Sequence, residues 1–166
     1  MKSHLKILLV FIIIAFIARI LISYHWRDTF DKRGNALYVI NIALNLINGD
    51  GYCVNEGVPS IDHEPGYPLF LAVGYKLFGY NWFGQYFFQI ILSILTGILI
   101  YLIGKQLLGI WVGVIASIYF MFYPYLFTQN LSVIDTTIFI FFLALIIYLF
   151  QCAVMKKQIK FAILTG

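Results

Sequence analysis

Charged side chains of both signs crowd one short segment after the first long apolar run. Asp28 and Asp31 stand three residues apart, and Arg27, Lys32 and Arg33 flank them. A carboxylate beside a bound hydroxyl can take its proton as a general base, and cationic side chains can hold an anion and stabilise charge that grows on a leaving group. The same residues could instead form a solvated, salt-bridged membrane edge, or the two aspartates could hold Mg²⁺ against a phosphate.

A second group, Asp62, His63 and Glu64, lies directly before the sequence 65–68, which contains two prolines. Because proline fixes φ, a turn here would hold the three side chains in a set position. They could bind substrate hydroxyls, and His63 could move a proton near pH 7; alternatively, they cap the helix that follows. Asp135 lies in an apolar run, about a turn and a half below its outer end at about 1.5 Å per residue, where an ionisable group usually faces a wet cavity or a bundle interior.

The composition places these residues in a membrane protein. Of the 166 residues, 62% are hydrophobic and 11% are charged, whereas a soluble domain is about half apolar and about a quarter charged. A crossing helix needs about twenty apolar residues. Four apolar runs are predicted as spans: 5–24, 80–103, 110–127 and 131–155. A fifth run begins at residue 161. The cations form no basic stripe, so no nucleic acid partner is expected, and the cysteine spacing predicts neither a disulfide framework nor a metal site.

The orientation of these spans depends on the segment from Pro65 to Gly79. It is apolar but only fifteen residues long, which favours a re-entrant or interfacial segment. If it does not cross, the positive-inside rule places most lysines and the N-terminus in the cytoplasm. All seven carboxylates then lie outside, six of them in the loop 25–79. Arg19, near the outer end of the first span, is expected to snorkel to the headgroups; alternatively, it neutralises an acid or a lipid phosphate.

The elements that position the charged groups follow from this topology. Residues 35–48 are predicted to form a helix with Asn35 as its N-cap and a Gly-Asp-Gly stop after it. Its polar residues form one narrow stripe, so it should lie flat on the membrane. The stretch 50–65 predicts an irregular loop, and Pro124 should kink the third span. We therefore expect an all-α polytopic membrane helix bundle with an extracytoplasmic loop that contains an interfacial amphipathic helix.

The order of these segments resembles a known family. NALYVINIALNLINGDGY (35–52) is followed by HEPGYPLFLAVGYKLFGYNWFGQ (63–85) and QIILSILTGILIYLIGKQLLG (89–109). This order is similar to the N-terminal part of the polytopic type C glycosyltransferases that use polyprenyl-phosphate sugars, of the protein mannosyltransferase and aminoarabinose transferase kind. The resemblance implies a multi-pass enzyme of the cell envelope that moves a sugar from a polyprenyl phosphate to a lipid, glycan or protein acceptor at the outer face, without a cofactor.

The resemblance also implies roles for individual residues. In the family, an outer-loop aspartate is thought to take the proton from the acceptor hydroxyl. Its usual position falls at residues 34–35, which are Gly and Asn here, so the base would be Asp31 or, second, Asp28. Arg27 and Arg33 would contact the lipid phosphate. The substrate-binding wall of the cavity would be formed by Asp62, His63, Glu64, Tyr67 and Asp135.

The length of the chain bears on its activity. Members of this family are several hundred residues long, so residues 1–166 are interpreted as the N-terminal part of a single glycosyltransferase-like domain, with little activity expected from this part alone. The alternative is a non-enzymatic polytopic protein, such as a transporter subunit or an envelope-assembly scaffold. A transporter would be expected to carry broken helices in two matching halves and ionisable groups at mid-depth. The acids here gather in one outer loop, which favours chemistry on a lipid-borne substrate.

Overall fold

The computed structural model describes residues 3–27, 35–55, 58–61, 63–129 and 132–156. The helices are α1 (Ser3–His25), α2 (Asn35–Asn48), α3 (Gly66–Phe78), α4 (Trp82–Leu107), α5 (Ile110–Phe122), α6 (Pro124–Gln129) and α7 (Thr136–Lys156). Two short strands, β1 (Cys53–Asn55) and β2 (Val58–Pro59), pair antiparallel. The all-α bundle is therefore confirmed. The stretch that was predicted to be wholly irregular holds this small hairpin.

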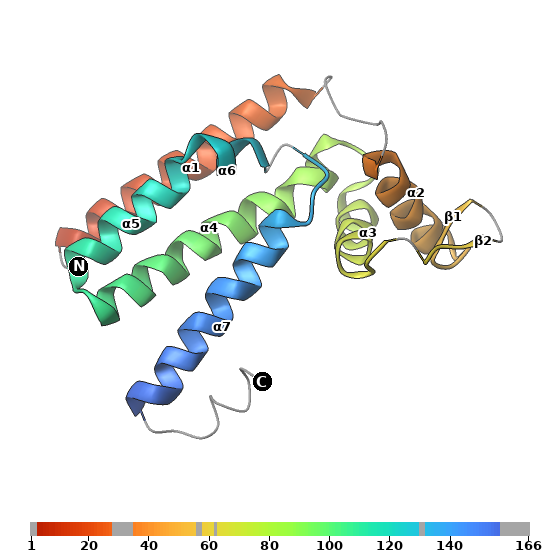
Figure 1. Ribbon diagram of the computed structural model, residues 1–166. Coiled ribbons are helices and arrows are strands. Elements are labelled where there is room, and N and C mark those ends of the chain that lie inside the picture. Colours follow the sequence, from red (N-terminus) through yellow and green to blue (C-terminus); the bar gives the residue numbers. More distant parts are fainter. Residues whose placement is uncertain (1–2, 28–34, 56–57, 62, 130–131, 157–166) are drawn as a thin grey trace.

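The long helices form a bundle in which α4 contacts α1, α5 and α7 (Figure 1). Within the described residues, three helices are long and apolar enough to cross a membrane, and they overlap the first, second and fourth predicted spans: Ser3–His25, Trp82–Leu107 and Thr136–Met155. The predicted fifth span, from residue 161, lies outside the described residues. The chain is thus an integral membrane protein with several crossings.

The third predicted span, 110–127, is not one continuous helix. α5 ends at Phe122, Tyr123 is extended with φ −65° and ψ 119°, and α6 begins at Pro124. Proline has no N–H to donate and disfavours helical geometry in the residue before it, so the helix is interrupted where only a kink was predicted. At about 1.5 Å per residue α5 alone is about 20 Å long, which is short of a hydrocarbon core of about 30 Å.

Arg19 stabilises this break, and the snorkelling interpretation of its side chain is wrong. Only 1% of Arg19 is exposed. Its Nη2 donates a 2.7 Å hydrogen bond to the carbonyl oxygen of Met121, and its guanidinium lies 4.6 Å from the centre of the Phe127 ring. The last carbonyls of a helix have no partner within that helix, so α5 gains a donor from α1. The cation is therefore held between α1, α5 and α6.

Glycines allow α4 and α5 to approach closely. A methyl group placed on Gly104 would lie 2.8 Å from the Cα of Gly113, and one on Gly113 would lie 2.6 Å from a backbone oxygen of α4. Ser117 Oγ donates a 2.7 Å hydrogen bond to the carbonyl oxygen of Gly97. Without a hydrophobic drive between helices in lipid, close contacts of this kind hold a bundle together.

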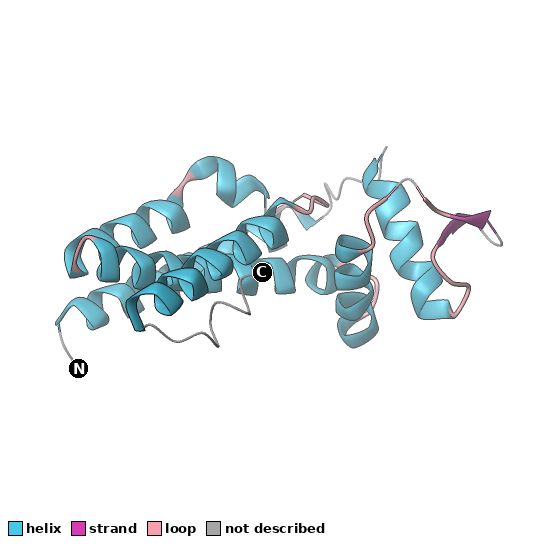
Figure 2. Ribbon diagram, turned by 60° about the horizontal axis from the view of Figure 1, so that its bottom comes forward, coloured by secondary structure: helices cyan, strands magenta, loops and turns pink. Residues whose placement is uncertain are grey.

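α2 and α3 form a second layer that lies crosswise to the bundle at one end (Figure 2). This is the end at which α1 ends and α4 and α7 begin (Figure 1), and we call it the loop end. α2 covers residues 35–48, as predicted. α3 has thirteen residues, too few to cross a membrane. The apolar core that the two helices share with the segment before α7 is formed by Val39, Ile40, Ala43, Tyr67, Leu71, Tyr75 and Val133.

The hairpin is attached to α2 through one residue of the predicted polar stripe. Asn45 Nδ2 donates to the carbonyl oxygens of Cys53, at 2.8 Å, and Val54, at 3.3 Å. The turn that brings β1 back to α2 passes through Gly49 and Gly51, whose φ angles are +91° and +85°, a region that glycine enters without a steric penalty. The hairpin is therefore held at a fixed position beside α2.

Candidate functional site

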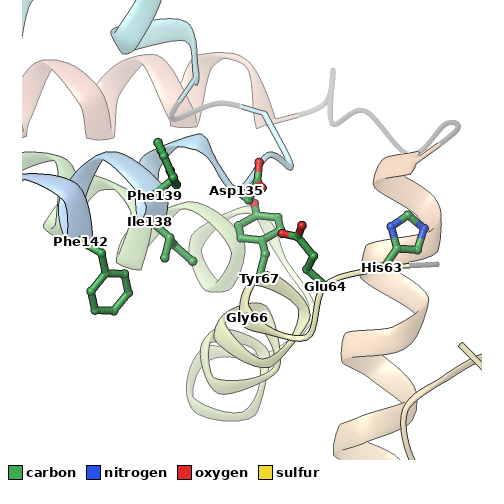
Figure 3. A pocket seen from close by; sticks show the side chains of 8 residues that line it. All are labelled: His63, Glu64, Gly66, Tyr67, Asp135, Ile138, Phe139 and Phe142. Carbon is green, nitrogen blue, oxygen red and sulfur yellow. The ribbon is translucent and has the colours of Figure 1, made fainter. Parts of the chain in front are cut away.

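A pocket opens at the loop end between the start of α3 and the start of α7 (Figure 3). Its volume is about 600 Å³. The part of the chain that the structure describes lines it with His63, Glu64, Gly66, Tyr67, Asp135, Ile138, Phe139 and Phe142. We call it the carboxylate pocket, because two carboxylates lie at its polar end while α7 supplies an apolar wall.

The structure brings together four of the predicted site residues, which come from two distant parts of the sequence: His63, Glu64, Tyr67 and Asp135. The Tyr67 hydroxyl points toward Asp135, and the Glu64 side chain lies beside the Tyr67 ring (Figure 3). Glu64 and Asp135 are exposed, so both carboxylates are open to a ligand. His63 lies farther off, beside α2 (Figure 3).

The depth predicted for Asp135 is wrong. α7 begins at Thr136, so Asp135 lies at the loop end directly before the first helical residue, instead of a turn and a half inside the span. Its carbonyl oxygen accepts the first helical hydrogen bond, from the Phe139 N–H at 3.0 Å. A carboxylate is favoured near a helix N-terminus by the helix dipole and is costly in lipid, which explains the later start of the helix.

Tyr67 is held in place by a residue that the sequence analysis missed. Gln89 of α4 is fully buried, and its Nε2 donates to the Tyr67 hydroxyl oxygen at 2.8 Å and to the Ser132 carbonyl oxygen at 3.3 Å. Because Ser132 belongs to the segment that leads to Asp135, one amide fixes both sides of the polar end. Burial raises the pKa of Tyr67 well above its usual value, and the negative charge of Asp135 adds to this shift, so Tyr67 remains a neutral hydroxyl.

A second glutamine repeats this contact away from the pocket. Gln85 lies one turn before Gln89 on α4, and its Oε1 accepts a 2.7 Å hydrogen bond from the Tyr75 hydroxyl. Polar groups inside an apolar span are costly and are usually paired with a partner, and residues four apart lie on one helix face. Two glutamines four apart within the predicted span 80–103 were therefore a usable signal for this contact with α3.

His63 lies on the border between the carboxylate pocket and α2. Its ring stacks on Tyr38, with 6.0 Å between the ring centres and an angle of 30° between the planes. Its carbonyl oxygen accepts a 2.7 Å hydrogen bond from the Tyr52 hydroxyl. The backbone and the ring of His63 are thus both fixed by residues of the loop, so its position relative to α2 is set before any ligand binds.

Arg27, one of the two cations predicted to contact a phosphate, is not among the described residues that line this pocket. The Arg27 guanidinium lies 4.2 Å from the centre of the Tyr24 ring, and its Nη1 donates to the Tyr24 carbonyl oxygen at 3.2 Å. Among the described lining residues there is no lysine or arginine, and the described residues contain no group of three side chains that could hold a metal ion. The other predicted site residues lie outside the described residues: Asp28, Asp31, Arg33 and Asp62.

The lining suits an amphiphilic ligand. Ionised carboxylates accept hydrogen bonds from hydroxyl groups, so a hydroxyl-rich head group fits the end of the pocket at Glu64 and Asp135. The side chains of Ile138, Phe139 and Phe142 offer apolar surface to a hydrocarbon chain. A phosphate would be repelled by both carboxylates and therefore has to lie away from the polar end.

Comparison with known proteins identifies a family whose sequence profile matches this chain. The sequence profile of the family described as dolichyl-phosphate-mannose-protein mannosyltransferase matches residues 62–166. An uncharacterized protein of Aquifex aeolicus (strain VF5) is 26% identical over 131 residues, which are 76% of this chain and 26% of the relative. This chain thus spans about a quarter of the length of that relative. No solved structure matches this chain.

Proposed function

Since this chain belongs to the dolichyl-phosphate-mannose-protein mannosyltransferase family, we propose that its carboxylate pocket holds the sugar of a polyprenyl-phosphate donor during transfer to an acceptor at the outer membrane face. The observation that carries the proposal is the mixed lining of this pocket. Glu64 and Asp135 line one end of it, and carboxylates accept hydrogen bonds from hydroxyl groups, which supports binding of a sugar there. The apolar wall of α7 supports binding of the polyprenyl chain.

The proposed reaction is a direct displacement. The oxygen of an acceptor hydroxyl forms a bond to the anomeric carbon of the donor sugar, and the bond from that carbon to the phosphate oxygen breaks. The phosphate leaves with the electron pair, and the hydroxyl proton passes to a carboxylate. We propose Asp31 as this base, with Asp28 second, and Arg27 and Arg33 as the cations that stabilise the charge growing on the phosphate.

The proposed orientation places the loop end outside the cell and the N-terminus in the cytoplasm. It rests on the lysines, most of which then lie on the cytoplasmic side. The short α3 supports it, because a non-crossing α3 keeps the loop from residue 25 to residue 79 on one side. The pocket then opens at the level of the outer headgroups, where the head of a polyprenyl-phosphate sugar lies.

The proposal is tested by transfer from a radiolabelled polyprenyl-phosphate sugar, with the full-length protein in lipid nanodiscs. Glu64→Gln and Asp135→Asn should each lower kcat/KM by about tenfold or more, the equivalent of one charge-assisted hydrogen bond. Asp31→Asn should lower kcat by about 10² to 10⁴ if it removes the general base. Asp50→Asn, a carboxylate in the same loop but outside the pocket, is the matched control. Full transfer in the first two variants, or no transfer by the full-length protein, would contradict the proposal.

A further inference from the structure

A second hollow lies on the other side of His63, between α2 and the β1–β2 hairpin. Its volume is about 530 Å³. The described residues that line it come from α2, both strands and the segment that leads to α3: Tyr38, Val54, Asn55, Val58, Pro59, Ser60 and His63. We call it the hairpin hollow. Residues 50–65 were predicted to form an irregular loop, and His63 alone among the lining residues was predicted to bind substrate.

The walls of the hairpin hollow are held in place without a ligand. Asn45 fixes β1 to α2, and the Ser60 N–H donates a 2.9 Å hydrogen bond to the Tyr52 carbonyl oxygen. The Tyr52 hydroxyl in turn bonds to the carbonyl oxygen of His63. These bonds join the hairpin, the segment after it and α2, so the hollow is a formed cavity whose opposite walls are tied together.

The lining combines an aromatic surface with neutral polar groups. Tyr38 is 49% exposed, and the ring of His63 stacks against one face of its ring, so both aromatic rings border the hollow. Asn55 is exposed, and its side-chain amide can donate and accept. The Ser60 Oγ is buried and makes no hydrogen bond among the described residues. A buried hydroxyl without a partner costs free energy, which a ligand or water could offset.

These features indicate the chemical class of the ligand. A sugar ring presents C–H groups on its face and hydroxyls at its edge, which match an aromatic surface beside an amide and a hydroxyl. The polar side chains among the described lining residues are an amide, a hydroxyl, a phenol and an imidazole. A neutral saccharide fits this combination of groups better than a phosphate or a charged peptide.

We propose that the hairpin hollow binds a neutral saccharide, and that this saccharide belongs to the acceptor. The second half rests on the proposed function of the carboxylate pocket. His63 lines both cavities, so a donor sugar in one and an acceptor in the other would meet at this residue. The carboxylate pocket borders the apolar wall of α7, whereas the hollow is formed by the crosswise layer, so the two substrates approach from different sides.

Direct binding tests the hollow independently of transfer. Neutral trisaccharides of glucose, mannose or galactose serve as probes, and saturation-transfer NMR with the full-length protein in nanodiscs measures their Kd. Tyr38→Ala should raise the Kd at least tenfold, whereas Tyr38→Phe, which keeps the stacked ring, should leave it within about twofold. Val58 is 63% exposed, so Val58→Trp should fill the hollow and abolish binding without disturbing the core. Tyr125→Ala, an exposed tyrosine of α6 outside both cavities, is the matched control.

Transfer kinetics then test whether the bound saccharide is the acceptor. Tyr38→Ala and Val58→Trp should raise KM for the acceptor at least tenfold and leave KM for the donor unchanged. If trisaccharides bind and the variants abolish binding but no transfer occurs, the hollow stands as a saccharide site and the proposed function fails. The proposed site is overturned if no trisaccharide binds, if binding survives both variants, or if the hollow binds an uncharged peptide in preference to a saccharide.

Discussion

Replacing Gln89 with methionine should weaken the carboxylate pocket without changing any residue that lines it. Methionine has a similar length and no amide, so Gln89→Met keeps most of the packing within α4 and removes both donated hydrogen bonds. The Tyr67 hydroxyl oxygen and the Ser132 carbonyl oxygen then lose the group that holds them at 2.8 Å and 3.3 Å. We expect the start of α3 and the start of α7 to move more independently of each other.

The size of the effect follows from these two bonds. A buried hydrogen bond is worth about 1 kcal/mol, and bonds between membrane helices average about 0.6 kcal/mol. The bond to Tyr67 is short and the bond to Ser132 is long, so the pair should contribute about 1 to 2 kcal/mol to stability. Because about 1.4 kcal/mol corresponds to a factor of ten, kcat/KM for transfer should fall about tenfold if this free energy serves to position the pocket.

Gln85→Met is the matched control for this variant. Gln85 is also fully buried, lies on the same helix and accepts a 2.7 Å bond from Tyr75, yet neither residue lines the carboxylate pocket. Both variants should lower stability in chemical unfolding in detergent, and Gln85→Met should lower it by less because it loses one bond and not two. Only Gln89→Met should lower transfer from a labelled polyprenyl-phosphate sugar by the full-length protein. Equal loss of transfer in the two variants, or full transfer in Gln89→Met, would refute the positioning role.

Three further predictions concern the bundle and the crosswise layer. Gly113→Ala places a methyl group against the backbone of α4 and should cost about 1 to 3 kcal/mol, whereas Gly97→Ala meets the flexible side chain of Met121 and should cost less; thermal unfolding of the two variants compares them. Arg19→Leu leaves the Met121 carbonyl without its donor from α1 and should lower the melting temperature, a loss that a snorkelling arginine would not produce. The raised pKa of Tyr67 means that its neutral form contributes stability below the usual tyrosine pKa of about 10 and that this contribution is lost as pH rises further. The Tyr67→Phe variant should therefore lose less stability between about pH 9 and pH 11 than the unsubstituted protein does. Chemical unfolding of both proteins at each pH measures this difference.

The sequence predicted elements whose ends carry local signals and missed features that depend on packing. α2 has its predicted bounds because Gly49 and Gly51 take positive φ angles and stop the helix. α4 continues to Leu107, past its predicted end at residue 103, since the glycine that ends it is Gly109, with φ +104°. The prediction from hydrophobicity placed Asp135 inside a span because the residues around it are apolar, whereas α7 starts at the next residue, Thr136.

The composition of the candidate site was only partly accessible from the sequence. The residues around His63 and Glu64 were identified because acids, a histidine and prolines occur together. Their meeting with Asp135 depends on how α3 and α7 pack at the loop end, which no local pattern encodes. The contribution of Gln89 was missed because a single amide in an apolar run does not by itself predict a contact. Its spacing of four residues from Gln85 does indicate a polar face of α4 that contacts another helix.

The two glutamines of α4 have a mechanical consequence for how a substrate enters. A helix tied at one point can pivot about it, whereas a helix tied at two separate points cannot turn without breaking a bond. α3 is tied to α4 at Tyr67 and at Tyr75, so the floor of the carboxylate pocket behaves as a rigid platform. Under the proposed function, the polyprenyl chain would then enter past the exposed Phe139 and Phe142 of α7, with no movement of this platform.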